Sequence, residues 1–253
     1  MGEVKSLAEG PRTTTRQPIR PSMGALRTIQ EELGALRRSA RKVAAGSVLL
    51  QDGEDWDQIL VVFEGWLSTS KSFEDGEIQI VDFGLPGDIL DPTSGDGETA
   101  GVAVDAITDA VVAMVPLGRW HTMLKASPRL QDQVDHIRAA GHARAAERLL
   151  RLGKGTAATR VTYALLELCL RLKAIGAASI DCAYHLPLTQ KDIGDFTGLS
   201  SVHVCRTMRR LVRHKIIETE DHLDIRILDV DALSELAQTD PERLVREITA
   251  FSS

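Results

Sequence analysis

A dense row of arginines, preceded by short polar side chains, stands in the C-terminal third of the sequence. Residues 189–216 contain six Lys or Arg and two Asp, a local net charge of +4. A guanidinium group can bind phosphate or grip guanine O6 and N7 together, and hydroxyl groups can bind bases or phosphates singly. Such side chains on one face of a helix are typical of a surface that enters the major groove of DNA.

Two short helices are predicted to position these side chains. Thr189 with Asp192 has the spacing of a capping box, so a first helix should begin there and run through Phe196. Gly198 should end it, because glycine adopts the left-handed backbone conformation without strain. Ser200 should then cap a second helix.

The second helix is amphipathic by sequence. Its apolar positions recur at spacings of four and three, at Val204, Met208 and Leu211. Its other faces carry Ser201, Val202, Cys205, Arg206, Arg209, Arg210 and Arg213. A helix-turn-helix needs this division, since one side packs on the first helix and the other faces DNA. The alternative is an ordinary helical hairpin with a solvated basic face.

Composition limits these interpretations. The chain has 253 residues, of which 43% are hydrophobic and 26% charged, enough for two domains with buried cores. Its net charge of −6 has the wrong sign for a general polyanion binder, so DNA binding would depend on the local cationic face. No apolar run approaches the ~18 residues of a membrane span and no charged-then-apolar leader opens the chain, so we expect a cytoplasmic protein. No nucleophile–base pair, metal-ligand spacing or phosphate loop points to an enzyme.

Turn signals at regular spacing organise the first half of the chain. Glycines preceded by Asp, Glu or Pro stand at 53, 65, 76, 87 and 97, which are 12, 11, 11 and 10 residues apart. The strand-like segments among them are SVLL, QILVVF, WLSTSKSF and EIQIVDFGL, followed further on by AVVAMV. Short strands punctuated by turns predict an antiparallel jelly roll. A helix over about 25–41 should precede it, with Leu26, Ile29, Leu33 and Leu36 on one face.

A short helix from Pro116 and then a long helix over about 128–152 should follow the jelly roll. The long helix has apolar or small residues at steps of three and four: Leu130, Val134, Ile137, Gly141, Ala145, Leu149 and Leu152. A stripe of about six turns is longer than packing on a small barrel needs, so we expect a second copy of the chain to cover it. The alternative is that the stripe packs wholly within its own domain.

The remaining segments complete an α+β architecture. We predict a helix over 157–173, a strand within 179–187, a winged hairpin from IIET and LDIRIL, and short helices over 231–237 and 241–251. The predicted domains are a disordered tail (1–23), a jelly-roll sensor domain (24–126), a dimerisation helix (127–153) and a winged helix-turn-helix domain (154–253).

This order of parts resembles the Crp/Fnr family of bacterial transcription regulators over about residues 25–238. The most specific pieces are the LPGD turn at 85–88, VDAITDAVVAMVP at 104–116 and LPLTQKDIGDFTGLSSVHVCRTMRRL at 186–211. The resemblance implies a homodimer that binds a two-fold-symmetric double-stranded DNA site and regulates transcription, with RNA polymerase as a further partner. It also implies roles for individual side chains: base reading by Ser201, Val202, His203 and Arg206, and phosphate contacts by Thr189, Gln190, Arg209 and Arg213.

The sequence departs from the family members that carry a cofactor or effector. Cyclic-nucleotide binders place an Arg-Ser or Arg-Thr pair on the phosphate, but Ala100 and Gly101 stand there, and no Arg or Lys lies between Lys71 and Arg119. No cysteine precedes Cys169 to hold an iron–sulfur centre, and the first histidine comes after the barrel, so we predict no cofactor and no metal. The alternatives are a divergent sensor for a cyclic nucleotide or another small ligand, and a non-DNA interaction module that has kept the fold.

Cys205 is a candidate redox site. It precedes Arg206 on the outward side of the second helix, and nearby cations favour the thiolate, the form that reacts with peroxide. The alternative is an inert small residue that fits the interface.

Overall fold

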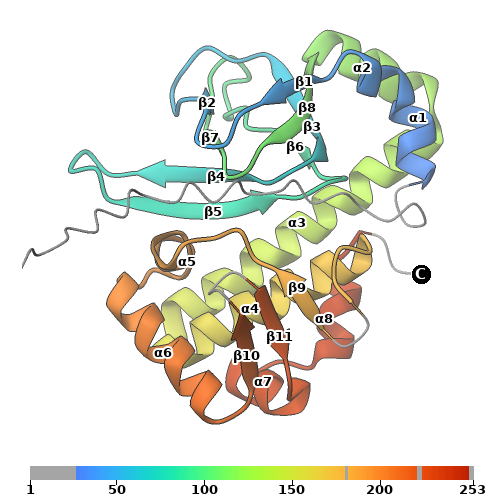
Figure 1. Cartoon of the computed structure of the whole chain (residues 1–253). Helices are drawn as coiled ribbons and strands as arrows, with labels where there is room; N and C mark the ends of the chain where they lie inside the picture. The colour runs from blue at the N-terminus through green and yellow to red at the C-terminus, as the bar shows by residue number, and fades with distance from the viewer. Residues whose placement is uncertain (1–26, 180–181, 221–223, 251–253) are drawn as a thin grey trace, which may run out of the picture.

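Two antiparallel sheets form the N-terminal half of the chain. The computed structural model describes residues 27–179, 182–220 and 224–250. One sheet has the order β1-β8-β3-β6 and the other β2-β7-β4-β5, with every pairing antiparallel. Their bounds are β1 Arg41–Val43, β2 Val48–Leu50, β3 Gln58–Glu64, β4 Leu67–Ser72, β5 Ile78–Gly84, β6 Ile89–Leu90, β7 Ala103–Ala106 and β8 Ala110–Pro116. The predicted jelly roll is confirmed (Figure 1).

The helix before the jelly roll ends earlier than predicted. Helix α1 covers Arg27–Arg38, and residues 41–43, at the predicted helix end, instead form β1 on the edge of a sheet. Its Leu33 and Leu36 are buried, as predicted. Gly65, in the turn between β3 and β4, has a φ of +81°, and a Cβ atom there would lie 2.2 Å from the carbonyl oxygen of Asp109. Only glycine fits this close approach of two turns.

Helices α2 (Leu117–Ala126) and α3 (Pro128–Lys154) lead away from the jelly roll. Ser127 caps α3 by accepting a hydrogen bond from the N–H of Leu130 at 3.2 Å. The first half of α3 packs on its own chain: Leu130, Val134 and Ile137 lie in one core with Leu33, Leu36 and Trp120. The predicted dimer surface therefore needs correction at these three residues, because α1, α2 and the sheet already cover them.

The buried face of α3 changes its chemistry halfway along. In the second half, Arg144, Arg148 and Arg151 point inward and are buried, while Ala145 is exposed and Leu149 is 71% exposed. Gly141 lies between the two halves and is half-buried. Of the predicted stripe, only the C-terminal part remains open to a partner.

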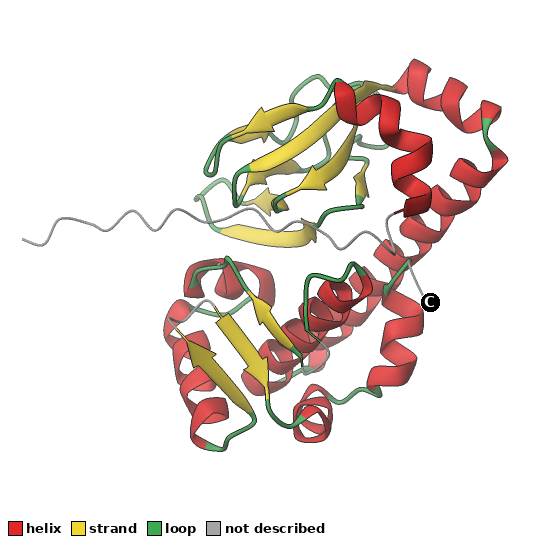
Figure 2. Cartoon of the chain, turned by 45° about the vertical axis from the view of Figure 1, so that its right-hand side comes forward, coloured by secondary structure: helices red, strands yellow, loops and turns green. Residues whose placement is uncertain are grey.

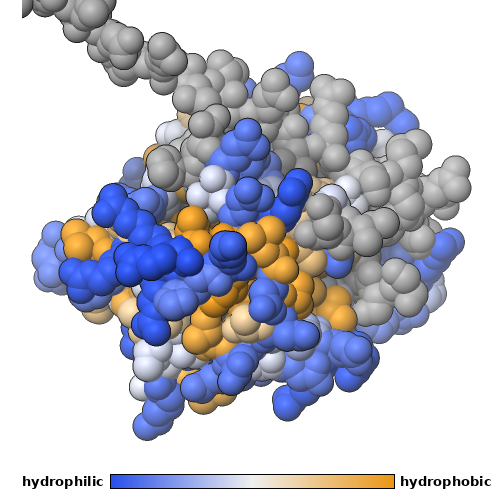
Figure 3. Space-filling model, turned by 60° about the horizontal axis from the view of Figure 1, so that its bottom comes forward, coloured by the Kyte–Doolittle hydropathy of each residue, from blue (hydrophilic) through white to orange (hydrophobic). Residues whose placement is uncertain are grey.

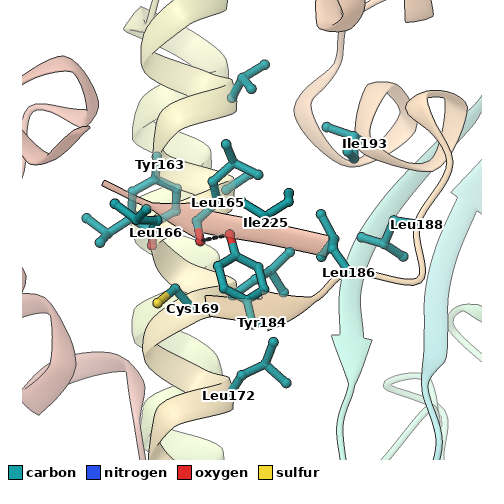
Figure 4. Packing of buried hydrophobic residues seen from close by; sticks show 14 of the residues in the cluster. Tyr163, Leu165, Leu166, Cys169, Leu172, Tyr184, Leu186, Leu188, Ile193 and Ile225 are labelled. Atoms are coloured by element: carbon teal, nitrogen blue, oxygen red, sulfur yellow. Dashed lines mark hydrogen bonds between the residues drawn. The ribbon is translucent and has the colours of Figure 1, made fainter. Parts of the chain in front are cut away.

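The C-terminal half is a helical domain with a small sheet. It contains α4 Ala157–Ala174, β9 Ala183–His185, α5 Gln190–Thr197, α6 Ser201–Arg213, β10 Ile217–Glu220, β11 Asp224–Ile227, α7 Val230–Ala237 and α8 Pro241–Ile248. The sheet order is β10-β11-β9, so the predicted wing is present. Figure 4 shows α4 packed against β9, with the Tyr184 hydroxyl donating to the carbonyl oxygen of Leu165 at 2.9 Å.

One apolar core joins the two halves of the molecule. Trp66, Ile80, Phe83 and Leu85 of the jelly roll belong to the same buried cluster as the side chains of α4, α5 and α6. The ring of Phe83 lies 4.8 Å, between centroids, from that of Phe196 in α5. The strands β4 and β5 thus rest on the helical domain, as both cartoon views show (Figures 1 and 2). Among the described residues, no helix is both long and apolar enough to cross a membrane.

Candidate nucleic-acid interface

The two helices predicted from the caps are present at the predicted places. Asp192 N–H donates to Thr189 Oγ1 at 3.1 Å, and Thr189 N–H donates to Asp192 Oδ2 at 2.7 Å, which completes the capping box of α5. Gly198 ends α5 in the left-handed conformation, with a φ of +63°. Ser200 caps α6. These local contacts fix the turn between the two helices.

A second glycine, which the sequence analysis did not single out, sets how closely the helices approach. Gly194 is buried in α5, and a Cβ atom on it would lie 2.5 Å from the carbonyl oxygen of Leu199. A side chain here would push the turn away from α5. Its spacing of four from Gly198 on the face toward the turn was the available signal.

Helix α6 turns its apolar side inward and its polar side to solvent. Val204 and Leu211 are buried, and Met208 packs partly buried against the same core. Val202, Arg206, Arg209 and Arg213 follow one another at spacings of four, three and four and are all exposed. Residues at these spacings lie on one face of the helix, as do the contact residues of a helix that lies in a major groove.

The three arginines of this row have no charged partner among the described residues. Within the described residues, the guanidinium groups of Arg206, Arg209 and Arg213 form neither an ion pair nor a hydrogen bond with another side chain. On the lower side of the molecule, hydrophilic side chains gather at the left, where α6 lies, next to a central apolar area (Figure 3). An unpaired cationic row is suited to a polyanion, because no internal carboxylate has to be displaced.

The other predicted contact residues differ in their exposure and in whether internal hydrogen bonds already engage them. Ser201 and Gln190 are exposed at the starts of α6 and α5. His203 is exposed, but its Nδ1 lies 2.9 Å from Ser200 Oγ, and the Thr189 hydroxyl is engaged with Asp192. Cys205 is half-buried, between the exposed row and the core.

The wing has an acidic surface. Glu218 and Glu220 of β10 are exposed, and Arg226 of β11 lies 3.8 Å from Glu218. Asp221, in the turn between the two strands, lies outside the described residues. The wing therefore adds no net positive charge beside α6.

A buried charged network at the domain junction was not predicted. Asp82 of β5 accepts from Arg144 Nη2 at 3.1 Å, from Arg148 Nη1 at 3.1 Å and from Arg171 Nη1 at 3.0 Å. Burial alone would raise the pKa of the Asp82 carboxyl, but the three guanidinium groups outweigh burial and hold it well below its ordinary value. Asp82 is therefore ionised and joins strand β5 to α3 and α4.

Arg171 extends this network into the LPGD turn. Its Nη2 donates to Asp88 Oδ2 at 2.8 Å and to the carbonyl oxygen of Phe83 at 2.6 Å. Arg148 also lies over the ring of Phe196, 5.0 Å from its centroid. The signal in the sequence was the spacing of four and three among Arg144, Arg148 and Arg151, which puts them on one face of α3.

A cavity of about 320 Å³ separates the jelly roll from α3, and it has no free cation for a phosphate. Of the arginines that line it, Arg144 and Arg148 bind Asp82, and Arg138 lies 3.6 Å from Asp91. Ala100 is buried outside the cavity lining. In the described part of the chain, no group of three or more His, Cys, Asp or Glu could hold a metal ion.

Known proteins share both halves of this arrangement. Residues 40–127 match the cyclic nucleotide-binding domain, and residues 143–236 match the Crp-like helix-turn-helix domain. The nitrogen fixation regulation protein FixK of Bradyrhizobium diazoefficiens is 30% identical over 209 residues, covering 81% of this chain and 86% of FixK. The transcriptional activator protein FnrA of Stutzerimonas stutzeri is 27% identical over 207 residues, covering 82% of this chain and 84% of FnrA. The solved structure of FixK2 from Bradyrhizobium japonicum has a TM-score of 0.68 at 25% identity, over 78% of this chain and 96% of that chain.

Proposed function

The chain belongs to the Crp/Fnr family and is a DNA-binding transcription regulator rather than an enzyme, and from this premise we propose how it reads DNA. Helix α6 enters the major groove with Ser201, Val202 and Arg206 against base edges. The observation that carries this proposal is the exposed, unpaired row formed by Val202, Arg206, Arg209 and Arg213.

Within this row, the residues nearer the start of α6 contact bases and those further along contact phosphates. Arg206 grips a guanine through O6 and N7, and the Val202 side chain packs on a thymine methyl group. Arg209 and Arg213, further along α6, contact phosphates together with Gln190 at the start of α5. Thr189 supports this contact indirectly, by capping α5 beside Gln190, because both its hydroxyl and its N–H are held by Asp192. His203 stands beside the base-reading side chains, with Nδ1 turned to Ser200.

We propose that the protein acts as a homodimer and that the second half of α3 forms the contact. Ala145 and Leu149 are exposed there, and Leu150 is 57% exposed, so an apolar strip lies open to water. Gly141, at the start of this strip, permits close approach of two helices. A two-fold dimer presents two α6 helices to the two halves of a palindromic site.

RNA polymerase is the further partner that we propose, because the related FnrA is named a transcriptional activator. Action on DNA together with RNA polymerase implies a cytoplasmic protein. We also propose that no cyclic nucleotide is required, since every arginine of the cavity beside α3 already faces a carboxylate.

The experiment that tests this function is selection of bound duplexes from a random pool by the purified full chain. We expect an inverted repeat whose half-site centres lie ~34 Å apart, one helical turn of DNA. The same selection with Arg206→Ala serves as the control. Recovery of unrelated sequences by the wild-type protein would contradict sequence-specific binding.

A further inference from the structure

The hairpin of β4 and β5 reaches across the helix-turn-helix (Figures 1 and 2). The side-chain amide of Gln79 donates from Nε2 to the carbonyl oxygen of Asp195 at 2.6 Å and to that of Phe196 at 3.1 Å. These carbonyl groups stand in the last turn of α5, where helix acceptors have no partner within the helix. Gln79 therefore ties the hairpin to the end of α5.

A cavity of about 480 Å³ lies between this hairpin and the start of α6. Residues 71–73 and 77–79 form one wall, and Lys191, Gly194, Asp195 and residues 198–201 form the other. Ser201 is also the first residue of the helix that we propose to enter the groove. The cavity thus adjoins the end of α6 that we propose to read base edges.

The tip of the hairpin is negatively charged, as the phosphate backbone of DNA is. Residues 73–77 read FEDGE, with three carboxylates and no cation. Glu77 faces Lys191 across the cavity, and the pKa of Lys191 is raised, mainly by its hydrogen bond with Asp195 and to a smaller extent by Glu77. Phosphates that approached along this side would meet like charges, which disfavours the complex.

We propose that the β4–β5 hairpin is an intramolecular cover of the helix-turn-helix that competes with DNA for the side of α5 and α6 facing the cavity. The inference rests on the proposed function, because it assigns a regulation to the same DNA-binding face. The acidic tip excludes the DNA strand, and Gln79 holds the tip of the hairpin against α5. DNA binding then requires residues 71–79 at the tip to leave the end of α5, while Phe83 keeps its packing on Phe196.

The test measures the affinity for one duplex of ~30 base pairs recovered by the selection above, long enough for two half-sites. Gln79→Ala removes the tie without changing charge, with Gln51→Ala on an exposed jelly-roll loop as the matched control. If about a tenth of the molecules are uncovered, Gln79→Ala should lower the dissociation constant by up to ~10-fold. A triple variant of the tip, Glu74→Gln, Asp75→Asn and Glu77→Gln, should lower it more than Asp55→Asn, Asp57→Asn and Glu98→Gln together, which change the net charge equally.

Hydrogen exchange of the wild-type protein supplies a second readout. Amides of residues 71–79 at the tip of the hairpin should exchange faster when the duplex is bound than when the protein is free. Equal affinities of the hairpin variants and their controls, or unchanged exchange of residues 71–79 on DNA binding, would overturn the cover. A failure of every variant to bind any duplex would instead reject the DNA-reading assignment, and the cover with it.

Discussion

Arg206 combines three properties that a base-reading side chain needs: a fixed positive charge, exposure, and no internal partner in the described chain. Arg209 shares them but lies one turn further along α6. The difference between the two residues therefore lies in where each side chain meets the duplex and not in its own chemistry.

We expect Arg206→Ala to abolish the preference for one base pair in each half-site, a loss of ~1–3 kcal/mol of discrimination. Arg209→Ala should weaken all sequences similarly and reduce the salt slope of log K by ~1. Fluorescence anisotropy with duplexes carrying single base-pair changes measures both effects. Wild-type sequence preference in Arg206→Ala would show that another side chain reads that base pair.

Loss of the Asp82 carboxylate should lower the stability of the domain junction strongly. In Asp82→Asn, three buried guanidinium groups lose their shared carboxylate, and breaking such a pair costs about 3–5 kcal/mol. Asp91→Asn is the matched control, because its pair with Arg138 is exposed and contributes about 0–1 kcal/mol. Urea unfolding followed by circular dichroism compares them, and equal losses would mean that the network does not hold the junction.

The loss of stability at low pH should follow in part from protonation of the same carboxyl group. The pKa of Asp82 in the folded protein lies below its ordinary value of 3.8, so its contribution is complete above that pH and is lost as the pH falls further. Unfolding free energies measured at descending pH should therefore converge for wild type and Asp82→Asn only under strongly acidic conditions.

At the scale of elements, α3 serves two purposes in succession. Its first half fills the jelly-roll core, and its second half presents arginines inward and an apolar strip outward.

Leu149→Glu should place like charges at the dimer seam, where an unpaired buried charge costs several kcal/mol. Sedimentation should then show monomers, and DNA affinity should fall because the two half-sites are no longer linked. Arg138→Glu, on the exposed face of the first half, is the control, and a Leu149→Glu protein that stays dimeric would place the seam elsewhere.

The elements that the sequence predicted well are those whose determinants are local. The caps of α5 and α6 join residues three apart, and Gly198 ends α5 through its own backbone. The strands β1, β6 and β7 were missed although β2 and β9, which are as short, were predicted, because β1, β6 and β7 are defined by pairing with strands distant in the chain. The Asp82 network was missed because its three arginine partners lie 62, 66 and 89 positions away in the chain. The regular spacing of apolar and small residues along α3 predicted one continuous dimer surface, whereas tertiary packing buries its first half within the same chain.

At the scale of the whole molecule, every arginine that lines the cavity between the jelly roll and α3, among the described residues, already faces a carboxylate. We expect calorimetry with cyclic AMP or cyclic GMP to show no binding with a micromolar dissociation constant, because Arg138, Arg144 and Arg148 are already paired. A rise in melting temperature with either nucleotide would contradict this. Asp82→Asn, which frees guanidinium groups beside the cavity, is the informative comparison.

The core shared by Trp66, Phe83 and Phe196 determines which parts of this chain can be exchanged in engineering. A fragment cut at residue 154 would leave Phe196 without the ring that packs on it, and would lose the carboxylate that Arg171 binds. A chimera that grafts this helix-turn-helix onto the jelly roll of a relative would have to carry the β4–β5 strand pair with it. The transplantable unit therefore crosses the apparent border between sensor and DNA-binding halves, and a deletion series would find its boundary inside the jelly roll.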